Sequence, residues 1–312
     1  AVYALDVTTP TTINASKVLW EVNSSTPSFA NLGYVLYNVQ SGKVEATGGT
    51  NDDWVGIFGN GVGSTSGYAS LFVVNLKTGA LLREFVVDTS GSNGLGGVRL
   101  VRDATQKVVG AYAGDLKGNL WKFDLTGSNK SAWTVGLGGS ALYAAGSTQP
   151  VTATPAIVPH PNGGYVVNFG TGKFYEQTDT APIAPATTFI TQRLYGVWDK
   201  QPFDGATSAP VGATLNNTSL LQQQTIGAVM IGGTEWYTVS TNAVNWGDGL
   251  AGVGAGGGYQ RGWYMDLPNS GQRVVYPIER LAERIGSTKV LVSTISPVSS
   301  AAADLCVQSG SG

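Results

Sequence analysis

Large apolar residues occupy alternate positions in short stretches along the chain, and each stretch is followed by Asp or Asn and, in most copies, by a turn that contains Gly. In a β-strand, alternate side chains face the same side, so each stretch presents one apolar face. Asp, Asn and Gly are residues that tight turns favour. The pattern therefore predicts a series of β-hairpins. The clearest copies cover residues 3–10, 36–44, 71–85 and 120–128, and looser copies cover 194–201 and 263–275.

The segments between these copies add more strands and very little helix. Further strands are predicted at residues 54–58, 108–113, 165–169 and 289–294. Apolar residues follow helical spacing only in residues 278–285, and residues 220–222 could form a single helical turn. We therefore expect an all-β protein whose helix content lies well below the usual third.

The alternation also predicts which side chains lie in the core, because a strand buries every second residue on one face. Buried positions are expected at Ile57, Leu71, Val73, Leu81, Tyr112, Leu120, Trp121 and Phe123. Exposed hairpin tips are expected at Lys77, Thr78, Lys117 and Asn119. Large aromatic residues commonly fill the space between packed sheets, and we expect this of Trp54, Trp121 and Trp263.

The spacing of the hairpins indicates how the strands are organised. The early copies lie about 35 to 50 residues apart, which is typical of the four-stranded blades of a β-propeller. We predict a single β-propeller domain over residues 1–312, with about six to seven antiparallel blades and an incomplete closure that leaves residues 3–7 in a blade short of partners. Residues 178–191 and 247–258 read as long loop insertions, and they are our candidates for a binding surface.

Composition narrows the class of protein. The chain is 42% hydrophobic, only 12% charged and contains 44 glycines, which suits a turn-rich protein outside the cell. A net charge of −2 without basic clusters argues against nucleic-acid binding. No apolar run is long enough to span a membrane as a helix. The single Cys306 excludes an internal disulfide framework, and it either pairs beyond this fragment or is a buried free thiol.

Candidate reactive groups do not form a catalytic set. The lone His160 lies between two prolines in a segment that reads as a solvated loop. Asp52 and Asp53 precede a strand and read as a turn rather than as the paired carboxylates of a glycosidase. Residues 59–64 are Gly-rich but have no Lys-Ser/Thr pair of a phosphate-binding loop. We therefore predict no catalytic and no cofactor-binding residues, and a protein that is not an enzyme.

Six motifs, in order along the chain, resemble those of the PilC/PilY family of type IV pilus tip-associated adhesins. They are YALDV at residues 3–7, IFGNG at 57–61, AYAGDLKGNLWKFDL at 111–125, FGTGK at 169–173, YGVWD at 195–199 and GWYMDL at 262–267. The resemblance implies the C-terminal propeller of such a protein, without the upstream adhesive region and ending near Cys306, one strand before the family's end.

The same resemblance implies a function, a location and partners. A member of this family is expected to support pilus assembly, to counteract retraction, and to contribute to twitching motility and surface adhesion. The implied location is the bacterial cell surface, the pilus tip or the extracellular space, including association with the outer membrane. The implied partners are minor pilins or other tip proteins, together with ligands on host cells or abiotic surfaces.

The family's calcium loop is degenerate in this chain. The resemblance places its ligand positions at Val101, Asp103, Thr105, Lys107 and Val109. Calcium takes six to eight oxygen ligands, and carboxylates supply much of the affinity. One carboxylate beside a lysine is a poor set, so we predict no metal here, although the family resemblance alone would imply calcium as a cofactor.

Two other functions fit a propeller of this kind. One is a protein–protein interaction scaffold like the outer-membrane assembly propellers, which bind partners through loops at the blade edges. The other is a quinoprotein-like dehydrogenase, whose blades carry similar hairpins. A dehydrogenase of that type needs a vicinal cysteine pair and a carboxylate–calcium cofactor site, and one cysteine argues against it.

Overall fold

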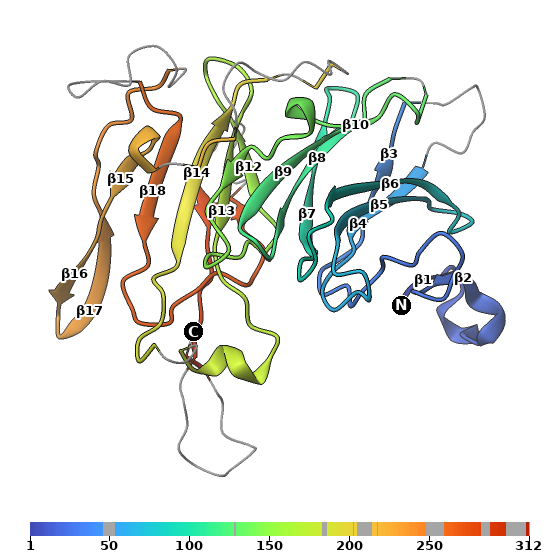
Figure 1. Ribbon diagram of the computed structural model, residues 1–312, viewed down its shortest axis with the longest axis horizontal. Helices are drawn as coiled ribbons and strands as arrows, with labels where there is room; N and C mark the ends of the chain where they lie inside the picture. Colours follow the sequence, from blue (N-terminus) through green and yellow to red (C-terminus); the bar gives the residue numbers. More distant parts are fainter. Residues whose placement is uncertain are drawn as a thin grey trace, which may run out of the picture.

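The protein is built from β-strands and short 3-10 turns, and the part that the structure describes contains no α-helix (Figure 1). The computed structural model describes residues 1–45, 54–127, 129–182, 186–201, 203–204, 214–216, 218–247, 259–281, 288–297 and 310–311. These residues form seven sheets, and three of the seven have four or more strands. The three large sheets lie side by side in Figure 1, in chain order from blue to orange.

The first large sheet is an antiparallel four-stranded blade with the order β3-β4-β5-β6. Its strands are β3 (Gln40–Lys43), β4 (Trp54–Gly59), β5 (Ala69–Asn75) and β6 (Leu81–Asp88). Every residue of β5 is buried. The turn after β5 forms because Asn75 Oδ1 accepts hydrogen bonds from the backbone N–H groups of Lys77 and Thr78, each at 3.0 Å. Gly79 then adopts a φ of 71°, which a residue with a side chain rarely tolerates.

The second large sheet has the order β10-β9-β8-β7, with β11 also paired to β9. Its strands are β7 (Leu95–Arg102), β8 (Val108–Asp115), β9 (Asn119–Asp124), β10 (Thr134–Val135) and β11 (Tyr143–Ala144). The strands β8 and β9 are almost wholly buried, which matches their apolar sequence.

The third large sheet has the order β12-β13-β14-β18-β15, and only its β15–β18 edge is parallel. Its strands are β12 (Ala156–Pro159), β13 (Tyr165–Gly170), β14 (Arg193–Asp199), β15 (Gln222–Gln224) and β18 (Gly262–Asp266). Of the helical turn predicted at residues 220–222, only Leu220 lies in a 3-10 turn, η5 (Thr218–Leu220), and Gln222 already begins β15.

Four smaller sheets have two strands each. They pair β1 (Val2–Leu5) with β2 (Val18–Val22), β16 (Ile226–Ile231) with β17 (Thr234–Val239), β19 (Glu279–Arg280) with β20 (Val290–Leu291), and β21 (Ser296–Pro297) with β22 (Gly310–Ser311). The helix expected at residues 278–285 is wrong over its described part, because Glu279 and Arg280 pair with Leu291 and Val290 in a sheet. Among the described residues, β1 pairs with β2 alone, and whether this blade is incomplete stays a prediction.

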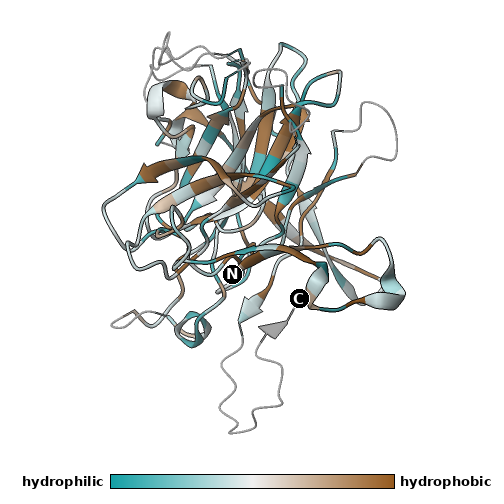
Figure 2. Cartoon of the chain, turned by 90° about the vertical axis from the view of Figure 1, so that its right-hand side faces the viewer, coloured by the Kyte–Doolittle hydropathy of each residue, from teal (hydrophilic) through white to brown (hydrophobic). Residues whose placement is uncertain are grey.

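The core fills the spaces between neighbouring sheets. One apolar cluster joins the first and second large sheets, a second joins the second and third, and smaller ones cover the outer faces. Figure 2 shows hydrophobic residues concentrated in the strands. Because each sheet is covered by its neighbours on its faces, the sheets pack in the manner of propeller blades.

The predicted core is largely confirmed. Ile57, Leu71, Val73, Tyr112, Leu120, Trp121 and Phe123 are buried, and Lys77 and Thr78 are exposed. Leu81 is only half-buried, because it packs at the margin of the cluster beside the first strands. Trp54 was expected between blades, but it is 54% exposed at the start of β4. Trp263 is half-buried against the apolar cluster on the outer face of the third sheet.

Candidate functional site

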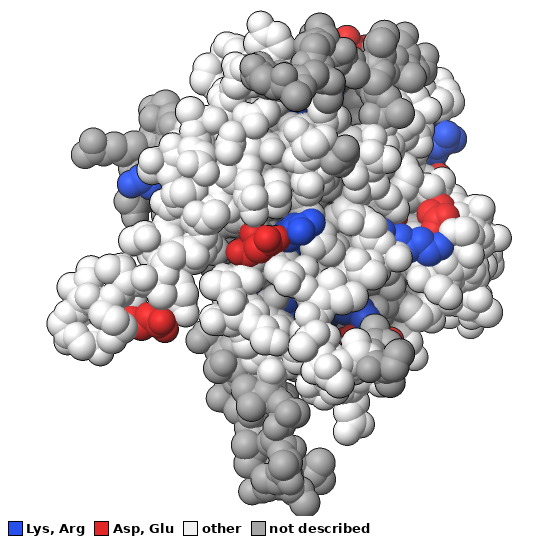
Figure 3. Space-filling view, turned by 60° about the vertical axis from the view of Figure 1, so that its left-hand side comes forward, with Lys and Arg blue, Asp and Glu red and all other residues white. Residues whose placement is uncertain are grey.

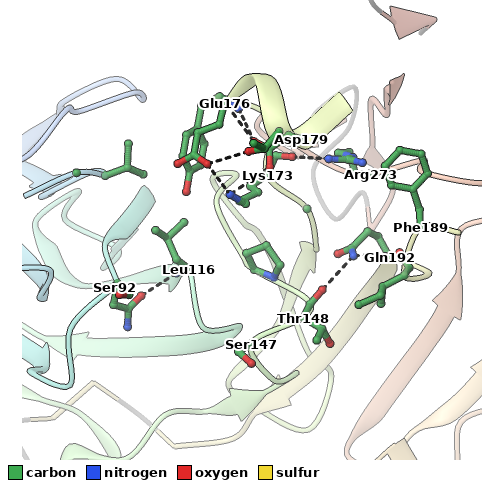
Figure 4. Close-up of a pocket in the computed structure, with 18 of the residues that line it drawn as sticks. Ser92, Leu116, Ser147, Thr148, Lys173, Glu176, Asp179, Phe189, Gln192 and Arg273 are labelled. Carbon is green, nitrogen blue, oxygen red and sulfur yellow. Dashed lines mark hydrogen bonds and ion pairs between the residues drawn. The ribbon is translucent and has the colours of Figure 1, made fainter. Parts of the chain in front are cut away.

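A cavity of about 830 Å³ lies where loops from all three large sheets converge (Figure 4). The loop after β4 contributes Val62 and Ser64, the turn after β8 contributes Leu116, and the segment between β13 and β14 contributes most of the remaining wall. The cavity therefore draws on the AYAGDL and FGTGK motifs and on the residues that directly follow IFGNG, three segments that lie far apart in the sequence.

The IFGNG motif holds the first wall in place. Asn60 is fully buried, and its Nδ2 donates to the backbone carbonyls of Asn31 at 2.9 Å and Tyr68 at 2.8 Å. Its Oδ1 accepts from the backbone N–H groups of Ser70 at 3.1 Å and Leu95 at 2.9 Å. All four hydrogen-bonding sites of the amide are thus used. The motif therefore ties the β4–β5 loop to the next sheet, and that it binds no phosphate stays a prediction.

The AYAGDL motif holds the second wall. The Asp115 carboxylate accepts from the backbone N–H groups of Lys117 at 2.9 Å and Asn119 at 2.8 Å, and from the indole N–H of Trp121 at 2.9 Å. The Lys117 ammonium forms an ion pair with Asp88 at 3.0 Å. Lys117 and Asn119 are therefore half-buried, and the prediction that both are exposed tips is wrong. The burial of Lys117 could not be predicted from the sequence of its own turn, because its partner Asp88 comes from the preceding blade.

Charged side chains gather at the rim formed by the third sheet. Lys173 contacts Asp179 at 3.1 Å and Glu176 at 3.3 Å. Asp179 is buried, and its Oδ2 accepts from the backbone N–H groups of Tyr175 and Glu176, each at 3.1 Å, which caps the 3-10 turn η4 (Gln177–Thr180). Burial lowers the pKa of Lys173, but the hydrogen bond and attraction to Asp179 outweigh this, so that the pKa is raised.

Arg273 completes this rim from the far end of the chain. Its guanidinium donates to the backbone carbonyls of Lys173 at 2.8 Å and Gly271 at 2.9 Å, and it lies 5.2 Å from the centre of the Phe189 ring. Burial lowers the pKa of Arg273. With two cations and two carboxylates the rim has no excess charge, so it offers no special attraction to a polyanion.

The remaining wall is mostly apolar, and this favours a ligand that has an apolar part. Leu36, Val62, Leu116, Pro150 and Phe189 all line it. Concave sites of this size with apolar walls and a few polar groups are typical of ligand or peptide binding. The described lining residues include no histidine or cysteine and no serine–base pair from which a nucleophile could be proposed.

The candidate binding loops have different outcomes. The described part of residues 178–191 does form a wall of this cavity, through Thr178, Ala181, Thr188 and Ile190 among others. Residues 248–258 of the second candidate loop lie outside the described residues. The structure thus places one of the two predicted loops at a cavity, and whether either binds a partner stays a prediction.

The degenerate calcium loop is a short turn between β7 and β8. Asp103 Oδ1 accepts from the backbone N–H groups of Thr105 at 2.8 Å and Lys107 at 3.0 Å. Val101 lies in β7 and Val109 in β8, so these two positions offer no side-chain oxygen. These residues do not fit a calcium site. Within the described ranges, no three His, Cys, Asp or Glu side chains form a metal-binding group. That the loop binds no calcium stays a prediction.

His160 is not in a solvated loop. Its side chain is 8% exposed and stacks on Trp198, with ring centres 4.3 Å apart, while Trp246 meets it edge-on at 4.6 Å. Burial lowers its pKa. The prediction failed because both tryptophans come from distant segments. Asp52, Asp53 and Cys306 lie outside the described residues.

Sequence reasoning missed one buried ionic junction between the second and third sheets. Lys122 Nζ lies 2.8 Å from Asp199 Oδ2, and both side chains are almost fully buried. Tyr112 donates to the same carboxylate oxygen at 2.6 Å. The available signal was a lysine between Trp121 and Phe123 in an otherwise apolar strand, since a buried charge requires a partner.

The packed antiparallel blades and loop-built cavity define a domain of the β-propeller class, and comparisons with known proteins identify its family. A family model described as the PilY1 beta-propeller domain matches residues 1–229, and the chain belongs to this family. The chain is 34% identical to the "Type IV pilus biogenesis factor PilY1" of Pseudomonas aeruginosa strain PAO1, over 97% of this chain and 26% of that protein. It is 37% identical to a PilY1 homolog of Xylella fastidiosa strain Temecula1, over 64% of this chain and 14% of that protein.

A solved structure agrees with these matches. The crystal structure of the Pseudomonas aeruginosa PilY1 C-terminal domain superposes with a TM-score of 0.75 at 32% identity, covering 94% of this chain and 61% of that one. The predicted fold class and family are thus confirmed. The chain spans about a quarter of the length of the Pseudomonas relatives. In the described part of the chain, no helix is long and apolar enough to cross a membrane.

Proposed function

We propose that this chain is the propeller of a non-enzymatic type IV pilus biogenesis factor that acts at the pilus tip or cell surface. In this role it supports pilus assembly, counteracts retraction, and contributes to twitching motility and surface attachment. The observation that carries the proposal is the likeness, over 97% of the chain, to a relative named a type IV pilus biogenesis factor. The likeness covers a quarter of that relative, so the role belongs to the full-length protein of which such a propeller is a part.

The loop-built cavity is where we propose that a partner protein docks, with minor pilins as the first candidates. Its apolar walls can accept an apolar side chain, and its balanced rim can hydrogen-bond a polypeptide backbone without demanding a particular charge. Figure 3 shows one face of the molecule on which charged side chains are sparse. A protein partner fits such a surface better than a polyanion does.

The role is tested by deleting this domain from the full-length protein in the bacterium. We expect fewer surface pili and reduced twitching, and we expect pili to return when the retraction machinery is also removed. Normal piliation and twitching after the deletion would overturn the proposed role. That result would favour the second candidate, a general interaction scaffold, for which the exposed β16–β17 hairpin gives independent support.

The docking cavity is tested separately with single substitutions. Leu116→Arg places a charged side chain in the apolar wall and should abolish the recovery of minor pilins in a pull-down with the full-length protein. Thr78→Arg, at an exposed turn of the first blade, is the matched control and should leave recovery unchanged. Equal recovery with both variants, each shown to be folded, would exclude this cavity as the pilin site.

A further inference from the structure

A second cavity, of about 480 Å³, lies on one face of the third large sheet, and its walls are aromatic. It is lined by Pro159, His160, Asn168, Trp246 and Trp263 together with a few smaller residues. We call it the aromatic cavity. It shares no lining residue with the loop-built cavity described above.

The strand register explains how one wall of the aromatic cavity is built. Asn168 of β13, Gly196 of β14 and Trp263 of β18 stand opposite one another in adjacent strands, so they share a face of the sheet. A Cβ at position 196 would lie 2.4 Å from the Cε2 and Nε1 atoms of Trp263. The indole of Trp263 therefore lies over the bare backbone of Gly196. This contact accounts for the glycine of the YGVWD motif and gives the cavity a flat aromatic wall.

His160 forms a second wall, and its orientation is fixed. Trp198 supports one face of the ring, and Trp246 packs against its edge. The Nδ1 atom accepts a hydrogen bond from the backbone N–H of Asn162 at 3.1 Å, so the neutral ring carries its proton on Nε2. Burial lowers the pKa of this histidine and favours the neutral form.

Several polar atoms of these walls have no hydrogen-bond partner in the described part of the chain. They are the Nε2–H of His160, the Oδ1 of Asn168, and the indole N–H groups of Trp246 and Trp263, and none of these atoms is among the fully enclosed side-chain atoms that lack a partner, so each is open to the cavity. In contrast, Trp20, Trp121 and Trp198 each donate from their indole at 2.8 to 2.9 Å. His160 and Asn168 are 8% and 4% exposed. Most polar side chains this deeply buried use their hydrogen-bonding atoms within the protein, so polar atoms left unpaired at the surface of a cavity are accessible to a ligand that enters it.

The cavity also lacks charge, which limits the class of ligand. None of its described lining residues is Lys, Arg, Asp or Glu. An anion would find no cation there, and a quaternary ammonium would find no carboxylate and several N–H donors. A neutral ligand with hydroxyl groups can instead accept from the N–H donors and donate to Asn168. Its C–H groups can pack against the electron-rich faces of the indoles.

From these features we infer that the aromatic cavity binds a neutral saccharide ring, with Trp263 as the stacking platform and His160 and Asn168 as its hydrogen-bonding partners. The volume lies within the range of small-molecule sites. This site goes beyond the proposed pilus role, because sugar binding is measured on the isolated protein and does not depend on pilus assembly.

The test begins with an array of neutral oligosaccharides that end in glucose, galactose, mannose or fucose, probed with the full 312-residue chain. Hits are then titrated in solution, with choline and a proline-rich peptide as competing probes. We expect binding to at least one neutral sugar and none to the other two probes. No binding to any neutral sugar, or binding of choline or the peptide alone, would overturn the assignment.

Variants locate the site. Trp263→Ala should weaken sugar binding by more than about tenfold, since it removes the platform. His160→Phe keeps the stacked ring but removes the donor, and should weaken binding by about fivefold to tenfold. Trp54→Ala is the matched control, because Trp54 is exposed and lines neither cavity. Urea unfolding verifies that each variant is folded. Unchanged affinity in both folded His160→Phe and folded Trp263→Ala protein would disprove this location.

Discussion

Two places on the third large sheet bury polar groups, and they do so in opposite ways. One is the ionic junction of Tyr112, Lys122 and Asp199, where the sheet meets the second blade. The other is the aromatic cavity, defined above by His160, Trp263 and their neighbours. Both contain aromatic rings and polar side chains that are at most 8% exposed. They differ in whether the polar atoms have partners.

In the ionic junction each charge is compensated. Lys122 donates to Asp199 and also to the carbonyl of Gln201 at 2.8 Å, and it lies 4.2 Å from the centre of the Phe203 ring. The Asp199 carboxylate also accepts the backbone N–H of Gln201 at 3.0 Å. Burial and the neighbouring Asp199 charge raise the pKa of Tyr112, so its hydroxyl stays protonated as a donor.

The contrast teaches how to separate structural polar groups from binding ones. A fully paired buried network fixes how two blades pack, and removing one member leaves another unpaired. Polar atoms beside a cavity without partners contribute little to packing and are available to a ligand. Substitutions should therefore destabilise the protein strongly at the junction and weakly at the aromatic cavity.

The largest effect is expected from Asp199→Asn. This change removes the carboxylate charge that pairs with the buried Lys122 ammonium, and we expect the free energy of unfolding to fall by about 3–5 kcal/mol. Urea unfolding followed by fluorescence measures it. Tyr112→Phe, which removes one neutral donor at the same carboxylate, should cost only about 1–2 kcal/mol. If Asp199→Asn lowered the free energy of unfolding by less than Tyr112→Phe does, charge pairing would not be what holds the junction together.

A smaller but clear loss is expected from Asn60→Ala. Two backbone carbonyls and two backbone N–H groups would lose their partner in a buried loop, which should cost about 2–4 kcal/mol. The melting temperature reports the loss. Asn129→Ala, at an exposed turn with one local hydrogen bond, is the control and should melt within a degree or two of the parent, about the limit for a surface change. Equal melting of the two variants would contradict the role assigned to the IFGNG motif.

Asn168→Ala should destabilise the protein by no more than about 1 kcal/mol, although Asn168 is almost as deeply buried as the junction residues. Its amide nitrogen makes one hydrogen bond, to the carbonyl of Val166 at 3.2 Å, and its oxygen makes none to a described residue. The same urea assay tests this. A loss as large as that of Asn60→Ala would mean that Asn168 serves the fold, and the contrast between the two regions would fail.

Lowering the pH should weaken the fold slightly through His160. Burial holds the pKa of His160 below its ordinary 6.5, so the unfolded chain takes up a proton first as the pH falls. The free energy of unfolding should therefore decrease as the pH falls from about 6.5 towards the pKa of the folded state. His160 is the only histidine, so the difference between the parent and His160→Phe across pH 7.5 to 5 isolates this contribution. Identical pH dependence would show that His160 titrates normally.

The smallest effect is expected at the degenerate calcium loop. Because Val101 and Val109 offer no side-chain oxygen, adding calcium after chelation should not shift the melting temperature of the parent protein. Asp103→Ala should respond to calcium in the same way as the parent. A calcium-dependent rise in the parent that Asp103→Ala abolishes would restore the family's metal site to this chain.

The sequence predicted the strands well because their signal is local. Short, mostly apolar runs such as residues 71–74 and 120–123 indicate strands, and in the structure both runs are buried on both faces. Turn chemistry was equally readable, as with Asn75 and Gly79. The isolated helical pattern at 278–285 was misleading, because Ile278 is buried by packing and Glu279 pairs with a strand ten or more residues away.

The chain by itself therefore determined an all-β architecture, its repeated hairpins and the family motifs. Only the tertiary structure decided that Lys117 is half-buried against Asp88, that Trp54 is exposed, and that His160 lies between two tryptophans. The physical reason is that strand periodicity and turns arise within a few residues, whereas burial at a blade junction or cavity depends on side chains from distant strands. Neither cavity could be read from the sequence, because each is the space left between segments that only the packed blades bring together.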